Sequence, residues 1–329
     1  MNKVKLLTIM IPLFNEEECI NELYIQLDKV SNSLTCSCEF LFINDGSTDQ
    51  TLELIKKIQH SDSRIAIVDL SRNYGKEIAM TAGLDYMKGD TLVIIDADLQ
   101  DNPELLPLMV KEIENGYDDV YAQRTSRKGE SWLKKTTSFL FYRLLAMMSS
   151  VPIQKDTGDF RMLSFKAIQA LRQLGENERN MKGLFSFIGF KKKPIYYVRD
   201  ERIAGKTKWN YFKLINLAIR GIIAFSIKPL RIISITGFFI SLASFAFLIK
   251  IVIKAVFYGD PVAGYPSMMS AILLLGGLQL LSIGVLGEYL GIVFSETKKR
   301  PIYFINDYFK INQNSETNSN AKGNEVKPN

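Results

Sequence analysis

Residues 91–101 constrain the fold of this chain more than any other part of the sequence. They begin with a continuous apolar run over residues 92–95, which is the pattern of a central strand buried on both faces of a parallel sheet. They end in Asp96, Asp98 and Asp101. Because ligands of open α/β sheets bind beyond the carboxyl ends of the strands, the segment predicts a strand that carries carboxylates into a ligand site.

Asp96 and Asp98 are separated by a single residue, so both carboxylates can reach one divalent cation at the end of this strand. Magnesium prefers oxygen ligands and usually shares them with the phosphates of a substrate. A solvated acidic turn or a helix cap is the alternative, because Pro103 indicates that a helix begins directly after Asp101. Taken alone, the two aspartates leave both interpretations open.

Strand and helix patterns alternate along the first part of the chain. Strands are expected over residues 6–14, 39–43, 64–70, 91–95 and 120–122, and helices after Asn15 as a cap, after Thr48 or Asp49, and over 76–87 and 103–115. Strands that alternate with helices indicate βαβ units. The sequence therefore predicts an α/β fold with a Rossmann-like, mostly parallel, doubly wound sheet.

Acidic or amide side chains stand at three of the expected strand ends, where they would meet at one edge of the sheet. They are Asn15, Asp45, and the pair Asp96 and Asp98. No G-x-G-x-x-G pattern opens the first helix, which argues against a dinucleotide whose pyrophosphate rests on a glycine turn. The pattern favours a nucleotide whose diphosphate is held through a metal ion.

The composition changes from Trp209 onward. Residues 209–229 are largely apolar with few charges, which predicts a helix lying in the membrane interface. Residues 232–249 and 261–287 contain no charged residue. Two such runs can cross a hydrocarbon core of ~30 Å, so we expect a hairpin of transmembrane helices over about 231–256 and 266–290. Buried helices of a soluble domain are the alternative.

Positive charge flanks the expected hairpin, with Arg220, Lys228 and Arg231 before it and three basic residues at 298–300 after it. Such flanks are typical of the cytoplasmic side of a membrane. The expected organisation is a cytosolic domain over 1–208, an interface helix over 209–229, membrane helices within 230–292, and a cytosolic basic segment with a disordered tail over 293–329.

Several function classes are excluded by composition. A net charge of +6 is compatible with nucleic acid binding, but the basic residues cluster near the apolar C-terminal segments and favour an anionic membrane surface. His60 is the single histidine, so a histidine-based catalytic triad is not expected. Cys19, Cys36 and Cys38 are odd in number and lack the spacing of a zinc site, which favours reduced cytosolic thiols.

Seven short motifs, taken together, resemble a known family. P-L-F-N-E-E at 12–17, N-D-G-S at 44–47, D-A-D-L-Q-D at 96–101, G-D-F-R at 158–161 and E-R-I-A-G-x-T-K at 201–208 resemble the family-2 glycosyltransferases that act on polyprenyl phosphates. G-E-Y-L-G at 287–291 and K-K-R-P at 298–301 are similar to the bactoprenol glucosyltransferase branch, relatives of dolichol-phosphate mannose synthase. The resemblance covers about residues 5–303.

The resemblance implies a GT-A fold and a transfer that inverts the anomeric configuration of the sugar. A hexose would move from a nucleotide diphosphate to the phosphate of a membrane lipid, for use in cell-envelope glycans. The favoured pair is UDP-glucose and undecaprenyl phosphate, with a multi-pass enzyme whose catalytic domain lies on the cytosolic side of the bacterial inner membrane. The same mechanism with aminoarabinose, N-acetylhexosamine or mannose stays open, because a few hydrogen bonds set sugar specificity.

The resemblance also carries site residues over to this chain. Those implied to bind the nucleotide are Pro12, Phe14, Glu16, Asp45, Asp96, Gln100, Arg202 and Lys208. Asp96 and Asp98 are implied to act in catalysis by holding Mg²⁺ or Mn²⁺ on the diphosphate. Those implied to receive the lipid phosphate are Arg124, Lys134, Lys135 and Ser138, in a stretch where dolichol relatives carry an arginine and this chain has lysines. A general membrane-facing basic patch is the alternative for this stretch.

Asp159 is the remaining catalytic candidate implied by the resemblance. Because the acceptor phosphate is already an anion at neutral pH, Asp159 would orient the acceptor or act as a weak base. The alternative is that Asp159 caps a helix that begins near Ser164.

Two other function classes remain. A non-enzymatic partner of a lipid-sugar flippase would not need Asp96 and Asp98. A processive polysaccharide synthase would carry a Q-x-x-R-W motif, which this sequence lacks. A homo-oligomer is compatible with each of these interpretations.

Overall fold

The computed structural model describes residues 3–124, 157–177, 179–197, 228–258 and 264–310. The chain divides into two compact units, of which the first consists of Met1–Leu140, Pro152–Trp209 and Lys299–Asn329. The second unit consists of Phe141–Val151 and Asn210–Lys298. The sheet belongs to the first unit, and the long apolar helices belong to the second.

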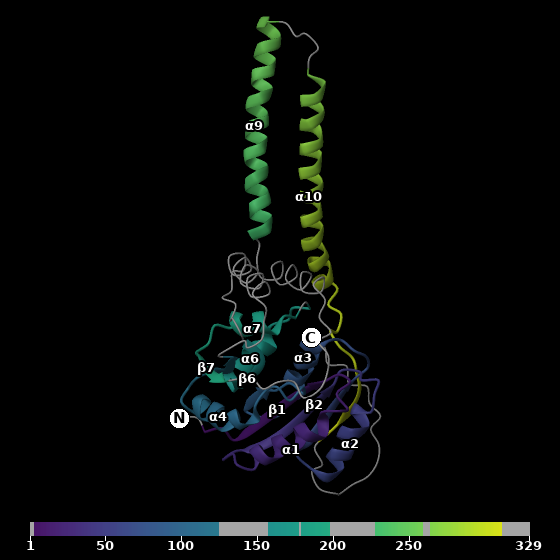
Figure 1. The fold of residues 1–329 in the computed structure, drawn as a ribbon, viewed down its shortest axis with the longest axis vertical. Helices are drawn as coiled ribbons and strands as arrows, with labels where there is room; N and C mark the ends of the chain where they lie inside the picture. Colours follow the sequence, from purple (N-terminus) through teal and green to yellow (C-terminus); the bar gives the residue numbers. More distant parts are fainter. Residues whose placement is uncertain (1–2, 125–156, 178, 198–227, 259–263, 311–329) are drawn as a thin grey trace. The chain divides into compact units, whose positions relative to one another are not determined.

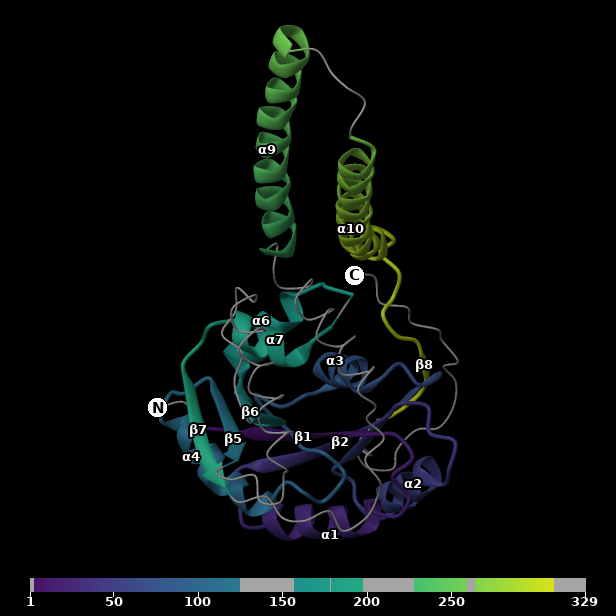
Figure 2. The ribbon, with the colours of Figure 1, turned by 45° about the horizontal axis from the view of Figure 1, so that its top comes forward.

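Eight strands of the described chain form one mixed sheet (Figures 1 and 2). They are β1 (Leu6–Leu13), β2 (Ser37–Asn44), β3 (Ile65–Leu70), β4 (Thr91–Ile94), β5 (Asp119–Arg124), β6 (Thr157–Ser164), β7 (Lys192–Tyr197) and β8 (Ile305–Phe309). Their order is β7-β5-β6-β4-β1-β2-β3-β8. The four strands from β3 to β4 run parallel, whereas β6 and β8 run antiparallel to their neighbours. The expected parallel sheet is confirmed in its centre, and antiparallel strands extend it.

Helices cover both faces of the sheet, as expected of a doubly wound fold (Figure 2). In the first unit they are α1 (Ile20–Ser31), α2 (Thr51–Ser61), α3 (Lys76–Tyr86), the 3₁₀ helix η1 (Pro103–Leu105), α4 (Leu106–Glu114), α6 (Phe165–Gln173) and α7 (Met181–Phe187). Leu23 and Leu27 of α1 are one helical turn apart and fully buried in the same cluster as Phe40 of β2. Burial of each such side chain contributes about 1.5–3 kcal/mol.

The expectation that Asn15 caps a helix is wrong. α1 begins at Ile20 after the cap residue Cys19, and Asn15 has a φ of 54° in the loop that leaves β1. The Asn15 side-chain oxygen accepts a hydrogen bond from Thr48 N at 2.8 Å, and the Asn15 N–H donates to Ser47 Oγ at 3.0 Å. Asparagine tolerates this left-handed backbone, and its side chain ties the loop after β1 to the loop after β2.

β6 was not expected from the sequence, and it bears on the interpretation of Asp159 as a helix cap. Asp159 lies within this strand, while Ser164 itself caps α6 by accepting a hydrogen bond from Ala167 N at 3.3 Å. The interpretation of Asp159 as a helix cap is therefore wrong. Side chains alternate along a strand, so Asp159 and Arg161 share one face of β6 whereas Phe160 belongs to the hydrophobic core.

The second unit contains two long apolar helices, α9 (Lys228–Tyr258) and α10 (Tyr265–Thr297). Both extend beyond the expected membrane spans. Among the described residues, the segment Leu274–Thr297 is long and apolar enough to cross a membrane, with a mean hydropathy of 1.6. The most apolar residues of this segment are not buried against other parts of the protein. The interface helix expected over 209–229 lies outside the described residues except for its last two, which begin α9.

β8 follows α10 in the chain and returns to the sheet of the first unit (Figure 1). It lies within residues 293–329, where only a basic segment and a disordered tail were expected. Its sequence I-N-D-Y-F has only five residues, and Asn306 and Asp307 interrupt the apolar pattern by which a strand could be predicted. The expected disordered tail from residue 311 lies outside the described residues.

Candidate active site

The candidate site lies where the parallel strands end. The register pairs Leu13 of β1 with Asn44 of β2, and Asn44 with Asp69 of β3, so these three strands end nearly level. β4 ends beside β1 at Ile94, directly before Asp96 and its neighbours. The loops after these strands therefore share the edge of the sheet where α/β proteins bind their ligands.

Asp45 is buried behind the loop that leads from β3 to α3. Its carboxylate accepts hydrogen bonds from Tyr74 N at 2.7 Å and from Gly75 N at 2.9 Å. Burial raises the pKa of Asp45, and these two N–H groups oppose the rise. Gly75 has a φ of 95°, which side-chain-bearing residues rarely adopt, so Asp45 and Gly75 together determine where α3 begins with Lys76.

A pocket of about 540 Å³ opens among the loops after β1, β2 and β3. Its lining residues are Phe14, Asn44, Gly46, Ser47, Thr48, Leu52, Asp69, Leu70, Ser71, Arg72, Asn73 and Asn306. Gly46 has a φ of 63°, and a Cβ added there would stand 2.4 Å from the carbonyl carbon of Arg72. The loops after β2 and β3 thus approach so closely that only glycine fits at this position.

Phe14 is the one expected nucleotide-binding residue of the described chain that lines this pocket, and it is 40% exposed. Asp45 lies behind the adjacent loop rather than on the pocket wall. Pro12 and Glu16 flank Phe14 in the chain without lining the pocket, and Glu16 N donates a hydrogen bond to Thr51 Oγ1 at 2.9 Å.

Four charged side chains meet beyond the end of β4, and we refer to Lys76, Asp96, Asp159 and Lys182 as the carboxyl-end cluster. Lys76 Nζ lies 2.5 Å from Asp96 Oδ1 and forms a second ion pair with Asp159 Oδ2. Lys182 Nζ lies 3.9 Å from Asp159 Oδ1. Lys76 belongs to α3 and Asp96 to the loop that follows β4. Asp159 belongs to β6 and Lys182 to α7, so four distant parts of the chain contribute to one site.

Two members of the carboxyl-end cluster, Lys76 and Asp159, have shifted pKa values. Burial favours protonation of Asp159, but the charges of Lys76 and then Lys182 outweigh it, so the pKa of Asp159 is lowered. Burial also disfavours the charged form of Lys76, but the two aspartates outweigh it and raise the pKa of Lys76. Lys76 and Asp159 therefore stabilise each other's charged form.

Glu77, next to Lys76, behaves differently. Burial, followed by the charge of Asp159, raises the pKa of Glu77 to about 7. Glu77 Oε2 accepts a hydrogen bond from Met181 N at 2.8 Å, which ties α3 to the first residue of α7. Glu77 thus supports the position of Lys182, and the Glu77 carboxyl itself changes charge near neutral pH.

Asp96 and Asp98 have the chemistry that a magnesium or manganese ion requires. Asp98 Oδ1 accepts a hydrogen bond from Gln100 N at 3.2 Å, across a turn in which Leu99 has a φ of 57°. Within the described ranges, no group of three or more His, Cys, Asp or Glu residues could hold a metal ion by itself. Two carboxylates fit a cation whose remaining oxygen ligands come from a bound diphosphate and water.

Arg161, in the same G-D-F-R motif as Asp159, is part of the scaffold. It is fully buried, and its Nη1 lies 3.1 Å from Oδ2 of the equally buried Asp119 in β5. Its guanidinium also lies 3.9 Å from the ring centre of Phe185 in α7. Within this motif, Asp159 belongs to the carboxyl-end cluster, whereas Arg161 is packed in the protein interior against Asp119 and Phe185.

Other expected residues stand apart from this geometry. Gln100 is buried beside Asp98. Arg124 ends β5 opposite Tyr197, and its side chain is not described. The residues that lie outside the described ranges are Lys134, Lys135, Ser138, Arg202 and Lys208.

Lys76 and Lys182 were missed from the sequence, and one of them left a usable signal. Lys76 is the first residue of a helix that follows a strand and a tight glycine turn. A lysine in that position points toward the same edge of the sheet as the strand-end carboxylates. Lys182 follows the cap residue Asn180 in a short helix, and nothing in the local sequence indicates its neighbours.

The chain was compared with known proteins. Residues 8–172 match the sequence profile of glycosyl transferase family 2, and residues 228–293 match that of the GtrB C-terminal hairpin. An uncharacterized glycosyltransferase of Synechocystis, sll0501, is 46% identical over 93% of this chain and 96% of its own length. The bactoprenol glucosyl transferase of Shigella phage SfX is 41% identical over 91% of this chain and 98% of its own length.

Among solved structures, glucosyl-3-phosphoglycerate synthase of Mycobacterium tuberculosis with Mn²⁺ and UDP is similar, with a TM-score of 0.46 and 20% identity. The match covers 67% of this chain and 76% of that one. The assignment rests on the sequence matches, which extend over both units of the chain and include the strand-end motifs described above. This protein is a glycosyltransferase that belongs to glycosyl transferase family 2 and carries a C-terminal hairpin of the GtrB type.

Proposed function

We propose that this enzyme transfers glucose from UDP-glucose to the phosphate of undecaprenyl phosphate or a related polyprenyl phosphate. One observation carries the proposal: a family-2 domain and a GtrB-type hairpin occur in one chain that is 41% identical, nearly end to end, to a bactoprenol glucosyl transferase. The product would be a lipid-linked glucose. An acceptor that never leaves the membrane also explains why a family-2 domain is joined to such a hairpin.

The donor nucleotide would bind along the ends of β1, β2 and β3. Phe14 offers an exposed ring to the uracil, and Asp45 keeps the neighbouring loop in position through its two hydrogen bonds. Pro12 and Glu16 would shape the same border from the loop after β1. Arg202 and Lys208 would lie near the diphosphate, as family membership suggests.

Asp96 and Asp98 would hold Mg²⁺ or Mn²⁺ against the diphosphate, beside Gln100. When bound, the metal ion would neutralise charge that develops on the leaving diphosphate. Lys76 would add a fixed positive charge at the same place, since its ammonium lies 2.5 Å from Asp96. In the transfer, an acceptor phosphate oxygen forms a bond to the anomeric carbon while the bond from that carbon to UDP breaks.

Asp159 would orient the acceptor and would not act as a strong base. The acceptor phosphate already carries negative charge at neutral pH, so there is no proton that must be removed before attack. The lowered pKa of Asp159 also makes it a poor base, and its ion pairs with Lys76 and Lys182 suit it to positioning cations around the phosphate. Arg124, Lys134, Lys135 and Ser138 would receive the lipid phosphate.

The membrane arrangement is part of the same proposal. Residues 1–208 would form a cytosolic catalytic domain, residues 209–229 an interface helix, and the parts of α9 and α10 near 231–256 and 266–290 two membrane spans. Basic residues before α9, in its first turn and after α10 favour a cytoplasmic position for both flanks. The enzyme would therefore be a multi-pass protein of the bacterial cytoplasmic membrane.

The test is a donor panel with the full-length enzyme in membranes. Polyprenyl phosphate is supplied with labelled UDP-glucose, UDP-N-acetylglucosamine, UDP-aminoarabinose or GDP-mannose, and the lipid product is identified by mass spectrometry. We expect label to enter lipid only from UDP-glucose, and we expect mild acid to break the bond between glucose and the lipid phosphate and release the labelled glucose. Transfer from another donor would replace glucose in the proposal, and transfer from none would favour a non-enzymatic partner of a flippase.

A further inference from the structure

β8, the strand that follows the long apolar helices, reaches the candidate nucleotide pocket. It pairs antiparallel with β3, and Ser71 N beyond the end of β3 donates a hydrogen bond to Phe304 O at 2.9 Å. The register places Asp69 opposite Asp307 and then Leu70 opposite Ile305, which leaves Asn306 as an extra residue. Such a bulge redirects a side chain away from the regular alternation of the strand.

The redirected side chain contacts a buried acid. Asn306 Nδ2 donates a hydrogen bond to Asp69 Oδ2 at 2.9 Å, and Asn44 Nδ2 donates to Asp69 Oδ1 at 2.6 Å. Asp69 is only 4% exposed. A buried carboxylate is costly unless hydrogen-bond donors reach it, so Asn306 and Asn44 together stabilise this acid within the sheet.

From Asp69 the hydrogen bonds continue to the loop that carries Phe14. Ser47 N donates to Asn44 Oδ1 at 3.3 Å, and Asn15 N donates to Ser47 Oγ at 3.0 Å. Asn306, Asp69, Asn44 and Ser47 all line the pocket. A continuous set of hydrogen bonds thus links β8 to the backbone next to Phe14.

β8 and the residues just before it also make contacts with residues that do not line the pocket. Tyr303 OH donates a hydrogen bond to Asp85 Oδ2 at 2.8 Å, and the rings of Tyr308 and Tyr86 meet edge to face with centroids 4.8 Å apart. Gln59 Nε2 donates to the carbonyl oxygen of Phe309 at 3.2 Å. Loss of one contact at Asn306 should therefore leave the strand paired.

We propose that Asn306 is a positioning residue for the donor nucleotide, acting through Asp69 and Asn44 on the pocket that receives the nucleoside part of UDP. The pocket would then be complete only when the segment after the membrane helices is in place. The inference rests on the proposed function in one respect, that the pocket between the loops after β1, β2 and β3 binds UDP.

The experiment measures UDP binding to the full-length enzyme in detergent, with Mn²⁺ present, by isothermal titration calorimetry. Asn306→Asp sets a second carboxylate against Asp69, and we expect it to raise the Kd for UDP about tenfold or more. Asn306→Ala removes the donor, and we expect a rise of about fivefold. The stoichiometry reports the folded fraction separately, so partial misfolding does not imitate a change in Kd.

The exchange Asp69→Asn with Asn306→Asp supplies the rescue. The amide at 69 can accept from Asn44 and donate to the carboxylate at 306, so the number of hydrogen bonds is kept. We expect this double variant to recover a Kd within about threefold of the wild-type value. Tyr303→Phe is the matched control, because it removes one hydrogen bond of the same segment outside the pocket and should leave the Kd unchanged.

Kinetics separate positioning from a purely structural role. The Asn306 variants should show a raised KM for UDP-glucose, with kcat and the KM for polyprenyl phosphate near their wild-type values. An unchanged Kd in both single variants would overturn the inference, as would a lowered melting temperature with no change in KM. A raised Kd that the exchange does not recover would contradict the link through Asp69.

Failure of the proposed function gives a different result. If wild-type enzyme binds GDP and not UDP, the donor assignment is wrong while the same variants, titrated with GDP, still test Asn306. If wild-type enzyme binds UDP and all variants equal it, the donor assignment stands and Asn306 has no positioning role.

Discussion

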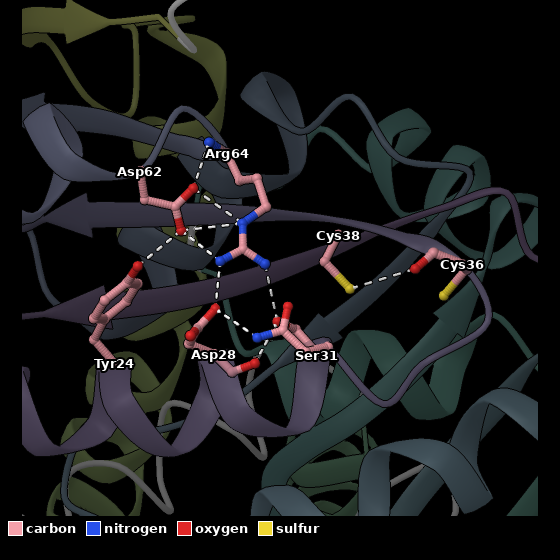
Figure 3. Close-up of polar contacts among 8 residues, drawn as sticks. Tyr24, Asp28, Ser31, Cys36, Cys38, Asp62 and Arg64 are labelled. Atoms are coloured by element: carbon pink, nitrogen blue, oxygen red, sulfur yellow. Dashed lines mark hydrogen bonds and ion pairs between the residues drawn. The ribbon is translucent and has the colours of Figure 1, made fainter.

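Two ion clusters lie at opposite ends of the central strands and are built from similar charged groups. They differ in how completely their polar atoms are paired within the protein. At the amino end, Arg64 precedes β3 and donates through Nε to both oxygens of Asp62 at 3.0 Å, and through Nη1 to Ser31 Oγ at 3.1 Å (Figure 3). Arg64 also pairs with Asp28 of α1, and Tyr24 OH donates to Asp62 at 2.8 Å. This amino-end cluster ties α1 to the start of β3.

The carboxyl-end cluster is less complete. Asp159 Oδ1 is buried and accepts no hydrogen bond from the described residues, with Lys182 Nζ still 3.9 Å away. Arg64 fits its acids with a planar fork, whereas Lys76 and Lys182 are point charges on flexible stems. The amino-end cluster is satisfied by the protein alone, and the carboxyl-end cluster keeps capacity for a ligand.

The electrostatics of the two clusters follow the same difference. The hydrogen bonds that Arg64 donates to Asp62 raise the pKa of Arg64, and burial followed by the hydrogen bond to Asp62 raises the pKa of Tyr24 to about 12. These groups do not change charge near neutral pH. Glu77 beside the carboxyl-end cluster, with a pKa of about 7, does.

The largest effect is expected at the pair beneath the carboxyl-end cluster. Arg161→Ala leaves Asp119 charged and fully buried without its partner, which should destabilise the fold by about 3–5 kcal/mol. Thermal unfolding in detergent would measure this, at roughly 2–4 °C for each kcal/mol. A loss below about 1 kcal/mol would mean that water reaches Asp119, and that this pair is not part of a closed scaffold.

Removal of the cation from the carboxyl-end cluster should affect catalysis. Lys76→Met deletes a positive charge beside the proposed position of the leaving diphosphate, and we expect kcat to fall about 30-fold, or about 2 kcal/mol of barrier. The melting temperature should change little in the presence of Mn²⁺ and UDP. Unchanged kcat, measured with saturating UDP-glucose, would make Lys76 a structural residue.

Removal of the cation from the amino-end cluster should have the opposite outcome. Arg64→Met should cost about 1–2 kcal/mol of stability, below the value for a buried pair because Arg64 and Asp28 are 32% and 36% exposed. Transfer activity per folded molecule should equal that of the wild type. A kcat that falls as far as in Lys76→Met would abolish the distinction between the two clusters.

The smallest effect concerns pH. The folded pKa of Glu77, about 7, exceeds its value in an unfolded chain, so its contribution to stability is complete below that unfolded value and is lost as pH rises through about 7. Glu77→Gln keeps an acceptor for Met181 N and removes this dependence. We expect the melting temperature of the wild type to fall by a few degrees more than that of the variant between about pH 5 and 8. Parallel curves would contradict the raised pKa.

Much of the central sheet was predictable because its strands are local patterns. The apolar runs of β1, β2, β3 and β4 stand between turn residues, and their buried positions match the runs. β6 was not predicted because Asp159 and Arg161 interrupt its apolar pattern. Each of these charges is paired with a residue from a distant element. β8 was not predicted because it becomes a strand through pairing with β3, which is far away in the chain.

The candidate site divides in the same way. Asp96 and Asp98 could be proposed from the sequence because a strand-end acid pair is a local signal. Asp159 was proposed through the resemblance, and its contacts with Lys76 and Lys182 depend on tertiary structure. Asn306 had no local signal at all, since a bulge opposite β3 directs it into the pocket.

We propose that the carboxyl-end edge carries out metal-assisted transfer from UDP-glucose, while the amino-end cluster only supports the fold. The most direct test measures glucosyl transfer to polyprenyl phosphate by Asp98→Asn and Arg64→Met at equal concentrations of folded enzyme with Mn²⁺. We predict a loss of at least ~100-fold for Asp98→Asn, about 2.7 kcal/mol of barrier, and wild-type activity for Arg64→Met. Full activity of Asp98→Asn, or of the wild type in EDTA, would contradict the claim.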